Sequence, residues 1–207
     1  MAIPTTNAAT ELPAVNQILA SVGQAPVTTL DQTNPDVAIA YDTLLQVSRE
    51  VQSEGWTFNQ EFEYVITVDS NKEYLIPNNV LQIDFSPSYV GNKDVVRRSG
   101  KLYDRYNHTF EIGDSVGDTF KTDVLWFFDW VDLPRPVQDY ITCKSATIVA
   151  QRIVGDPNLV ATLQQREVLS RANAMEYECN QGDYTFFGQP RGSKYYTSYQ
   201  PYKALYR

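Results

Sequence analysis

The sequence predicts an α+β protein in which helices from both ends of the chain form one bundle, with an inserted antiparallel β domain and an extended C-terminal tail. Apolar residues recur at helical spacing within residues 1–55 and again within 133–182, and short β-type runs lie between these two regions. The predicted parts are a helical hairpin over residues 1–55, the inserted β domain over 56–132, further bundle helices over 133–182 and an interaction tail over 183–207.

Length and composition limit the classes of protein that this chain can represent. It has 207 residues, of which 43% are hydrophobic and 20% are charged. A chain of this size buries roughly 70% of its extended surface, so it can form one domain or two small ones without a disulfide or a metal. The composition excludes disordered and collagen-like chains. The apolar runs are too short to span a bilayer, so no membrane partner is expected.

The first helix is predicted over residues 11–22. Its apolar residues fall on one stripe, which is typical of a helix that packs against a core. Thr10 is placed to cap its start, and Pro13 fits the first turn, where a missing N–H is tolerated. Gly23 can adopt the left-handed conformation that ends a helix.

Three further helices carry equally clear start and stop signals. In the second, Asn34 precedes a proline at the first helical position, and the apolar spacing continues to Gly55. The third begins at Pro134 and stops at Gly155. An Asp-Pro pair then restarts a helix that is expected over residues 157–179. Four helices in two pairs therefore predict a bundle assembled from both ends of the chain.

The middle of the chain predicts short strands. Runs rich in Val, Ile, Tyr and Phe are separated by Gly, Asn, Pro and Asp at the intervals of an antiparallel meander. We therefore expect a small β sandwich or a barrel-like sheet. The expected strands cover residues 63–68, 73–77, 80–85, 95–98, 102–105, 110–112 and 124–130.

Charge is distributed unevenly along the chain. The net charge is −8, and the segment nets are −5 for residues 1–55, −6 for 56–132, 0 for 133–179 and +3 for 180–207. A general nucleic-acid binder is excluded, because affinity for phosphate depends on clustered Lys and Arg. The basic end on an acidic body is the most uneven feature of the sequence.

The same C-terminal segment is rich in aromatic residues, with eight rings that form neither a helical nor a strand stripe. Exposed rings favour aggregation, whereas Tyr and Arg are enriched at the centres of protein interfaces. The tail is therefore predicted to bind a neighbouring subunit or partner, and the alternative is that it folds back over its own bundle. The predicted interface residues are Tyr184, Phe186, Phe187, Arg191, Lys194, Tyr195, Tyr196, Tyr199, Tyr202, Lys203, Tyr206 and Arg207.

Residues that could carry catalysis are few. Glu61 and Glu63 would share one face of a strand, which is compatible with the paired carboxylates of glycoside hydrolysis, although solvated edge charges are the favoured interpretation. His108 is expected in an exposed turn, and the sequence shows neither a nucleophile nor an orienting acid for it. Phosphate-binding loops, nucleophile elbows and HExxH motifs do not occur. No catalytic residue and no cofactor are predicted.

A metal site is not predicted either. Two cysteines, Cys143 and Cys179, and one histidine cannot form a Cys/His zinc cluster, and both thiols are expected to be buried and reduced. The loop at residues 113–118 lacks the alternating oxygen ligands of an EF-hand. The first ten residues hold no base and no long apolar run, so no signal peptide is expected and folding in a reducing cytosol is predicted.

Several stretches together resemble a known family. They are residues 14–23 (AVNQILASVG) with 26–30 (PVTTL), residues 52–59 (QSEGWTFN), residues 174–178 (AMEYE) and, more weakly, residues 102–105 (LYDR). Their order and spacing are similar to those of the tail tubular protein A family of T7-like short-tailed bacteriophages. The main departure is a longer, more tyrosine-rich C-terminal tail.

This resemblance implies a structural virion protein with no catalytic residues to carry over. Such adaptors, or gatekeepers, form a twelve-membered ring below the portal, bind the nozzle protein (tail tubular protein B) on the other side and help to seat the tail fibres. The ring would surround the DNA channel without binding DNA specifically. The resemblance therefore implies a location in the phage tail, after synthesis and assembly in the cytoplasm of the bacterial host.

Charge is consistent with such a channel. Twelve copies at −8 would carry about −96 formal charges, which would repel passing DNA and keep it centred. Two other classes of function stay open at this point. One is a glycan-hydrolysing tail protein that uses acidic residues, and the other is an acidic binding module unrelated to virions.

Overall fold

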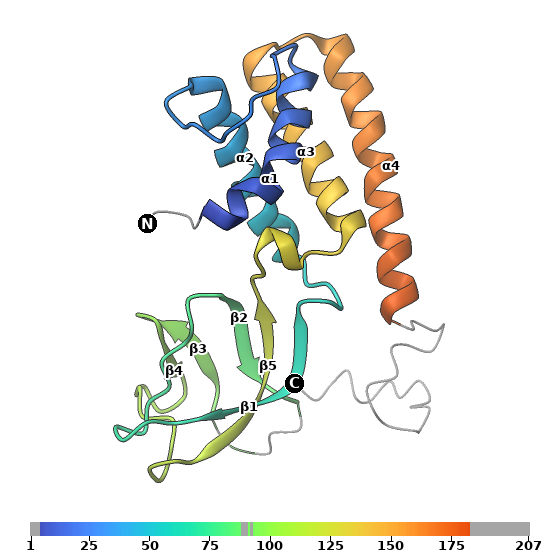
Figure 1. Cartoon of the computed structure of the whole chain (residues 1–207). Coiled ribbons are helices and arrows are strands. Elements are labelled where there is room, and N and C mark those ends of the chain that lie inside the picture. Colours follow the sequence, from blue (N-terminus) through green and yellow to red (C-terminus); the bar gives the residue numbers. More distant parts are fainter. Residues whose placement is uncertain (1–4, 88–90, 92, 183–207) are drawn as a thin grey trace.

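The computed structural model describes residues 5–87, 91 and 93–182, and it has the predicted α+β architecture (Figure 1). Helices from both ends of the described chain lie together at one end of the molecule, and the strands between them in sequence lie at the other end. The predicted tail at residues 183–207 lies outside the described residues.

Helix α1 (Thr5–Ser21) begins earlier than the sequence predicted. The expectation that Thr10 caps it is wrong, and Pro13 lies inside the helix rather than in its first turn. Ala8 and Ala9 extend the helix toward the N-terminus, since alanine has the highest helix propensity. The predicted end is confirmed, because Gly23 has a φ of +78° and its N–H donates to Ala20 O at 3.2 Å.

The other three helices start at or directly after the prolines that predicted them. In α2 (Pro35–Gln52) the side chain of Asn34 accepts a hydrogen bond from Asp36 N at 3.0 Å, which confirms the predicted cap. Helix α3 (Arg135–Ile153) follows Pro134 directly. Helix α4 (Pro157–Gly182) extends three residues beyond the predicted end.

Helices α1, α2 and α3 surround one hydrophobic cluster. Its members are almost fully buried, as the apolar stripes of the sequence predicted, and they include Val15, Ile18, Val37, Leu44, Val47, Tyr140, Ile141 and Val149. Helix α4 lies along the outside of α3 (Figure 1) and contributes only Ala174 to this cluster. Most of the surface of α4 is therefore exposed.

In the described part of the chain, five strands form two antiparallel sheets. They are β1 (Gln60–Thr67), β2 (Val80–Phe85), β3 (Val95–Arg98), β4 (Lys101–Asp104) and β5 (Thr119–Trp126). One sheet has the order β1-β5-β2, and the other pairs β3 with β4. Side chains from both sheets share a second hydrophobic cluster, which includes Ile66, Ile83, Val95, Leu102 and Val124. The prediction of a small β sandwich is confirmed.

Two of the predicted strands are wrong. Residues 73–77 form only an isolated bridge between Leu75 and Lys101, and residues 110–112 form no strand. Ile76 and Ile112 are nevertheless buried in the sandwich, and their N–H groups donate to carbonyls of loop residues. Burial of apolar loop residues thus produced the pattern that resembled strands.

The last predicted strand, residues 124–130, is shifted in the structure. Strand β5 begins five residues earlier and ends at Trp126. Trp130 lies instead in a short 3₁₀ helix (Trp130–Asp132) and belongs to the helical cluster. The apolar run therefore spans two elements, because the chain leaves the sheet and enters the helical core within these residues.

Candidate interaction surfaces

The two chain segments that connect the helices to the sheet are joined by buried amides. The side chain of Gln52 accepts a hydrogen bond from Phe128 N at 2.8 Å and donates to Phe128 O at 3.1 Å. Asn59 Nδ2 donates to Gln52 O at 2.9 Å and to Trp126 O at 3.0 Å. Both amide side chains are buried, with exposed fractions of 0% and 1%. We call these contacts the junction, and they fix the outgoing and returning segments to each other.

The tryptophan and glycine of the 52–59 motif shape the turn between α2 and β1. Trp56 Nε1 donates to Val51 O at 2.7 Å, and Trp56 N donates to Asn59 Oδ1 at 2.9 Å. Gly55 has a φ of +79°, and a Cβ there would lie 2.5 Å from Gln60 Nε2. The positive φ therefore favours glycine at this position, whereas the flexible end of the Gln60 side chain could move aside.

The 174–178 motif meets the 52–59 motif in space. The carboxylate of Glu178 accepts hydrogen bonds from Thr57 N at 2.9 Å and from Thr57 Oγ1 at 2.9 Å. Ala174 precedes Glu178 by about one helical turn and is fully buried. Arg171, earlier on the same helix, forms an ion pair with Glu54 at 3.1 Å. The C-terminal end of α4 is thereby held beside the junction. The sequence alone gave no signal for this pairing, because its partners are 121 positions apart.

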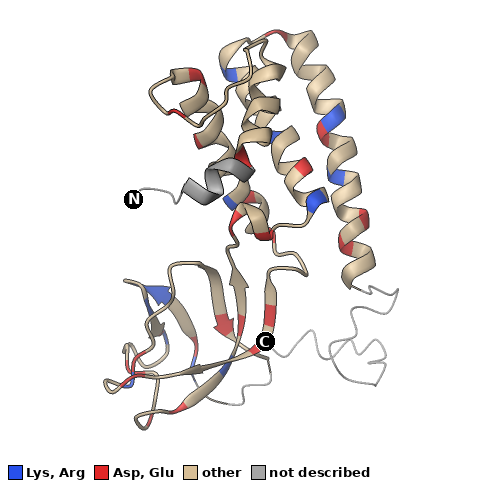
Figure 2. Cartoon of the chain, viewed as in Figure 1, with Lys and Arg blue, Asp and Glu red and all other residues tan. Residues whose placement is uncertain are grey.

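A cleft of about 450 Å³ lies between the turn after α2 and the three-stranded sheet. Its lining combines carboxylates with apolar side chains, and none of its described lining residues is Lys or Arg. The acidic lining residues are Glu54, Glu61, Asp84 and Asp123, and the apolar ones are Phe62, Phe85, Pro87, Val124 and Leu125. Figure 2 shows acidic residues, coloured red, on both the helices and the strands, and the cleft brings acids of the sheet together with Glu54 from the turn after α2.

Asp84 has the most perturbed carboxyl in this cleft. Burial raises its pKa, a hydrogen bond from Phe85 N opposes that shift, the charges of Asp94 and Asp123 raise the pKa further, and the charge of Arg105 lowers it in part. A carboxylate whose ionisation is disfavoured by neighbouring carboxylates gains from an added cation. The cleft is therefore suited to a basic partner.

The two glutamates considered for glycan hydrolysis have separate partners. Glu61 accepts a hydrogen bond from Trp126 Nε1 at 3.0 Å, and Glu63 forms an ion pair with Lys121 at 2.8 Å. The strand register shifts between Glu61 and Tyr64, and Glu63 has a φ of +55°. The regular alternation on which their pairing depended is thus interrupted, and the expectation of a shared strand face is wrong.

The structure places the histidine and the cysteines as follows. His108 lies exposed in a turn, as predicted. Cys143 is buried and free, also as predicted. Cys179 is free but exposed, so the prediction that it is buried is wrong. It follows Glu178 on α4, and only one narrow face of that helix packs against α3.

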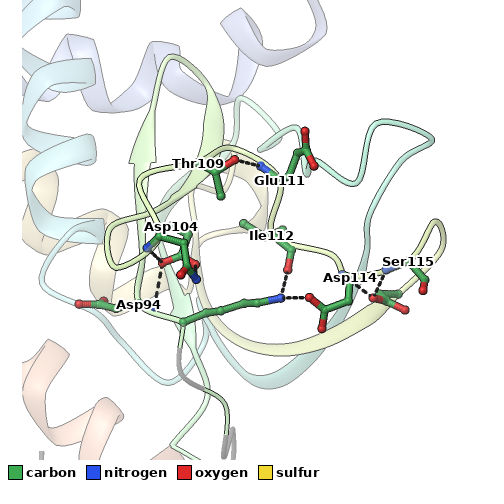
Figure 3. A network of polar contacts seen from close by, with 10 residues as sticks. Asp94, Asp104, Thr109, Glu111, Ile112, Asp114 and Ser115 are labelled. Atoms are coloured by element: carbon green, nitrogen blue, oxygen red, sulfur yellow. Dashed lines mark hydrogen bonds and ion pairs between the residues drawn. The ribbon is translucent and has the colours of Figure 1, made fainter.

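The loop at residues 113–118 is closed by its own hydrogen bonds (Figure 3). The carboxylate of Asp118 accepts from Asp114 N at 2.8 Å and from Ser115 N at 2.7 Å. Lys93 Nζ donates to Asp114 Oδ1 at 2.9 Å and to Ile112 O at 2.7 Å. Among the described residues, no group of three His, Cys, Asp or Glu could hold a metal ion.

The aspartate of the LYDR stretch organises the turn after β4 (Figure 3). Asp104 is fully buried, and its carboxylate accepts from Tyr106 N at 2.9 Å, from Asn107 Nδ2 at 2.6 Å and from Asp94 N at 3.4 Å. Burial opposes its charge, but the hydrogen bonds from Asn107, Tyr106 and Asp94 together lower the pKa of Asp104.

We expect Asp104→Asn to destabilise the protein by about 1–3 kcal/mol at pH 7, because it leaves buried N–H donors without their charged acceptor. A lowered native pKa stabilises the fold above the unfolded pKa of about 3.9, and this contribution disappears as the pH falls through the native pKa. Urea unfolding at pH 7 and at pH 3 should therefore show a difference from wild type that shrinks in acid. The control Asp42→Asn, at an exposed carboxylate on α2, should change stability by at most about 0.5 kcal/mol.

Helix α4 carries a second exposed feature. Val168, Leu169 and Met175 have exposed fractions of 70%, 63% and 44%. Large apolar side chains grouped on one helix face are typical of a protein interface. The interface residues predicted from the sequence, Tyr184 to Arg207, lie outside the described residues.

Comparison with known protein families gives a match that covers both the helices and the strands described above. The model of the tail tubular protein family matches residues 12–184, which span α1 to the end of α4. The chain belongs to this family. The resemblance found in the sequence is confirmed, and the tail tubular protein described here is a structural component of the bacteriophage tail. No curated protein matches the chain.

For this tail tubular protein, the family motifs have structural explanations. They build the junction, anchor α4 beside it and close the turn after β4. None of its described helices combines the length and the apolar character required to cross a membrane. The cleft and the exposed apolar residues of α4 are two candidate interaction surfaces in the described part of the chain.

Proposed function

We propose that this tail protein is the adaptor ring that joins the portal to the tail nozzle and surrounds the DNA channel. The observation that carries the proposal is the exposed apolar face of α4, given by Val168, Leu169 and Met175, in a member of the tail tubular protein family. A closed ring requires a heterologous interface between two different patches on each subunit. The α4 face is suited to be one of these patches, and the neighbouring copy is its partner.

The acidic character of the chain supports a channel for DNA. A net charge of −8 per subunit repels the phosphate backbone, so DNA would pass without specific binding. In this proposal the ring is a dodecamer, the nozzle protein (tail tubular protein B) binds on the side opposite the portal, and the tail fibres are seated at the ring. Its place of assembly is the host cytoplasm.

The test is to mix the purified protein with portal rings and image the product by electron microscopy, after measuring the mass of the free protein. We expect a second ring below the portal. A protein that stays monomeric and shows no affinity for portal rings would favour the freestanding acidic binding module. If the protein hydrolyses a polysaccharide and the Glu61→Gln variant does not, the result would favour the glycan-hydrolysing tail protein.

A charge on the α4 face should prevent ring formation. We expect Leu169→Lys combined with Val168→Lys to abolish the portal-bound ring, because two ammonium groups would have to be buried at a subunit interface. Gln46→Lys, at an exposed position of α2 rather than α4, is the control and should assemble normally. Electron microscopy reads out assembly, and circular dichroism verifies that all variants are folded. A ring formed by the double variant would exclude this face from the interface.

Deletion of residues 183–207 should block attachment to portal-filled heads. This segment holds eight aromatic residues and has a net charge of +3, which suits it to bind acidic surfaces of the portal or of a neighbouring subunit. Attachment is measured by counting heads with tails after mixing, and the shortened protein must first show the thermal stability of the full chain. Normal attachment would remove this segment from the proposed function.

A further inference from the structure

We propose that the acidic cleft binds the basic, aromatic segment 183–207 of the same chain before the protein assembles. The proposal extends the proposed function, in which that segment binds other proteins of the tail after assembly. The cleft is lined by acidic and apolar residues, whereas the segment is basic and aromatic, so the two are complementary in charge.

The chemistry of the two parts matches. The cleft presents four carboxylates beside phenylalanine, proline and leucine side chains, without a lining Lys or Arg among the described residues. The segment holds four bases, one acid and eight aromatic rings. Charge-assisted hydrogen bonds from Arg and Lys to the carboxylates are stronger than neutral ones, and Tyr and Phe rings pack on the apolar wall.

The volume of the cleft suits a few side chains of the segment. At about 450 Å³ it falls in the range of roughly 300–1,000 Å³ that is typical of ligand pockets. A basic residue and one or two rings would fill it, while the remainder of the segment lies elsewhere. A cation bound near Asp84 would add to the effect of Arg105 in offsetting the repulsion from Asp94 and Asp123.

The position of α4 indicates that the occupant comes from the same chain. Glu178 binds Thr57, and Arg171 pairs with Glu54, which itself lines the cleft. The helix ends at Gly182, about one turn after Glu178. The segment therefore starts beside the rim, and its 25 residues can extend up to about 80 Å. A tethered segment has an effective concentration in the millimolar range, which favours it over the segment of another copy.

Binding of this kind has a consequence for assembly. Rings held in the cleft are withheld from intermolecular contacts, so free subunits stay soluble at high concentration. Assembly would then require the segment to leave the cleft for its partner.

The full-length protein can be tested with a carbodiimide, which joins a Lys ammonium to a carboxylate in direct contact, followed by mass spectrometry. We expect links from Lys194 or Lys203 to Asp84, Glu54, Glu61 or Asp123. With a mixture of unlabelled and ¹⁵N-labelled protein, each link should join two peptides of the same isotopic form. Links between different forms would assign the segment to a neighbouring copy, and both this result and a lack of links to the cleft would overturn the proposal.

A charge reversal gives the matched comparison. Asp84→Lys should reduce the links from the segment to the remaining cleft carboxylates at least fivefold. Asp42→Lys, at an exposed acid on α2 outside the cleft, should leave them unchanged. An equal yield in both variants would contradict the proposal. The experiment uses the isolated protein, so its failure leaves the ring proposal to be decided separately by imaging with portal rings.

Discussion

Gln52→Leu is expected to destabilise the protein by about 2–4 kcal/mol. The Gln52 side chain is fully buried and forms hydrogen bonds with both the N–H and the C=O of Phe128. Leucine fills a similar volume but leaves these two backbone groups without partners, at roughly 1–3 kcal/mol for each buried group. Urea unfolding followed by circular dichroism measures the difference.

The control for this prediction is Gln46→Leu, the same substitution at an exposed position of α2. It should change the free energy of unfolding by at most about 0.5 kcal/mol. Similar losses in the two variants would mean that the helix, and not the junction, is sensitive to the substitution. A small loss in Gln52→Leu alone would mean that water replaces the amide at Phe128.

Leu102→Ala is expected to have an even larger effect, about 2–5 kcal/mol. Leu102 is fully buried in the cluster shared by the two sheets, and the lost methyl groups would leave a cavity there. Leu44→Ala is the matched variant, because Leu44 is equally buried in the helical cluster. Urea unfolding measures both losses.

The same pair of variants tests the proposal that residues 56–132 form a domain of their own. The two hydrophobic clusters have no residue in common. We therefore expect Leu102→Ala to accelerate amide hydrogen exchange in β1, β2 and β5 more than in α2 and α3, and Leu44→Ala to do the opposite. Equal acceleration of both parts in both variants would show one cooperative unit.

Helix ends were predictable where the signal is local. Asn34 with its following proline, and the glycines at 23, 55 and 155, act through the conformation of their own residues, so sequence alone locates them. The start of α1 was not predictable, because Thr10 also has the side chain of a good cap and its use depends on what precedes it.

Strands were predictable only where burial and pairing coincide. Ile76 and Ile112 lie in runs that were predicted as strands, and both are buried, but apolar composition does not show whether the backbone pairs with a neighbouring strand. The bulge at Glu63 is a similar case, since it depends on the register with β5. Both errors therefore concern backbone hydrogen bonds rather than the core.

The candidate surfaces were the least predictable part. The cleft joins Glu54 from the first connecting segment with Asp84 and Asp123 from two strands, and no short sequence pattern contains all three. The contact between Glu178 and Thr57 depends on the same long-range packing. The C-terminal tail, residues 183–207, could be identified from the sequence because its basic and aromatic composition can be counted without knowledge of the fold, whereas a cleft cannot.

The side-by-side connections at the junction also limit how the sheet can move relative to the helices. A domain joined by one flexible segment can rotate about that segment. Here the two connecting segments are hydrogen-bonded to each other through Gln52 and Asn59, which restricts the β domain to a hinge-like tilt. In a circular assembly, every β lobe would then point in the same rotational sense around the axis. If the proposed ring forms, a change in the width of its lumen through these parts would therefore require each β domain to tilt at its junction.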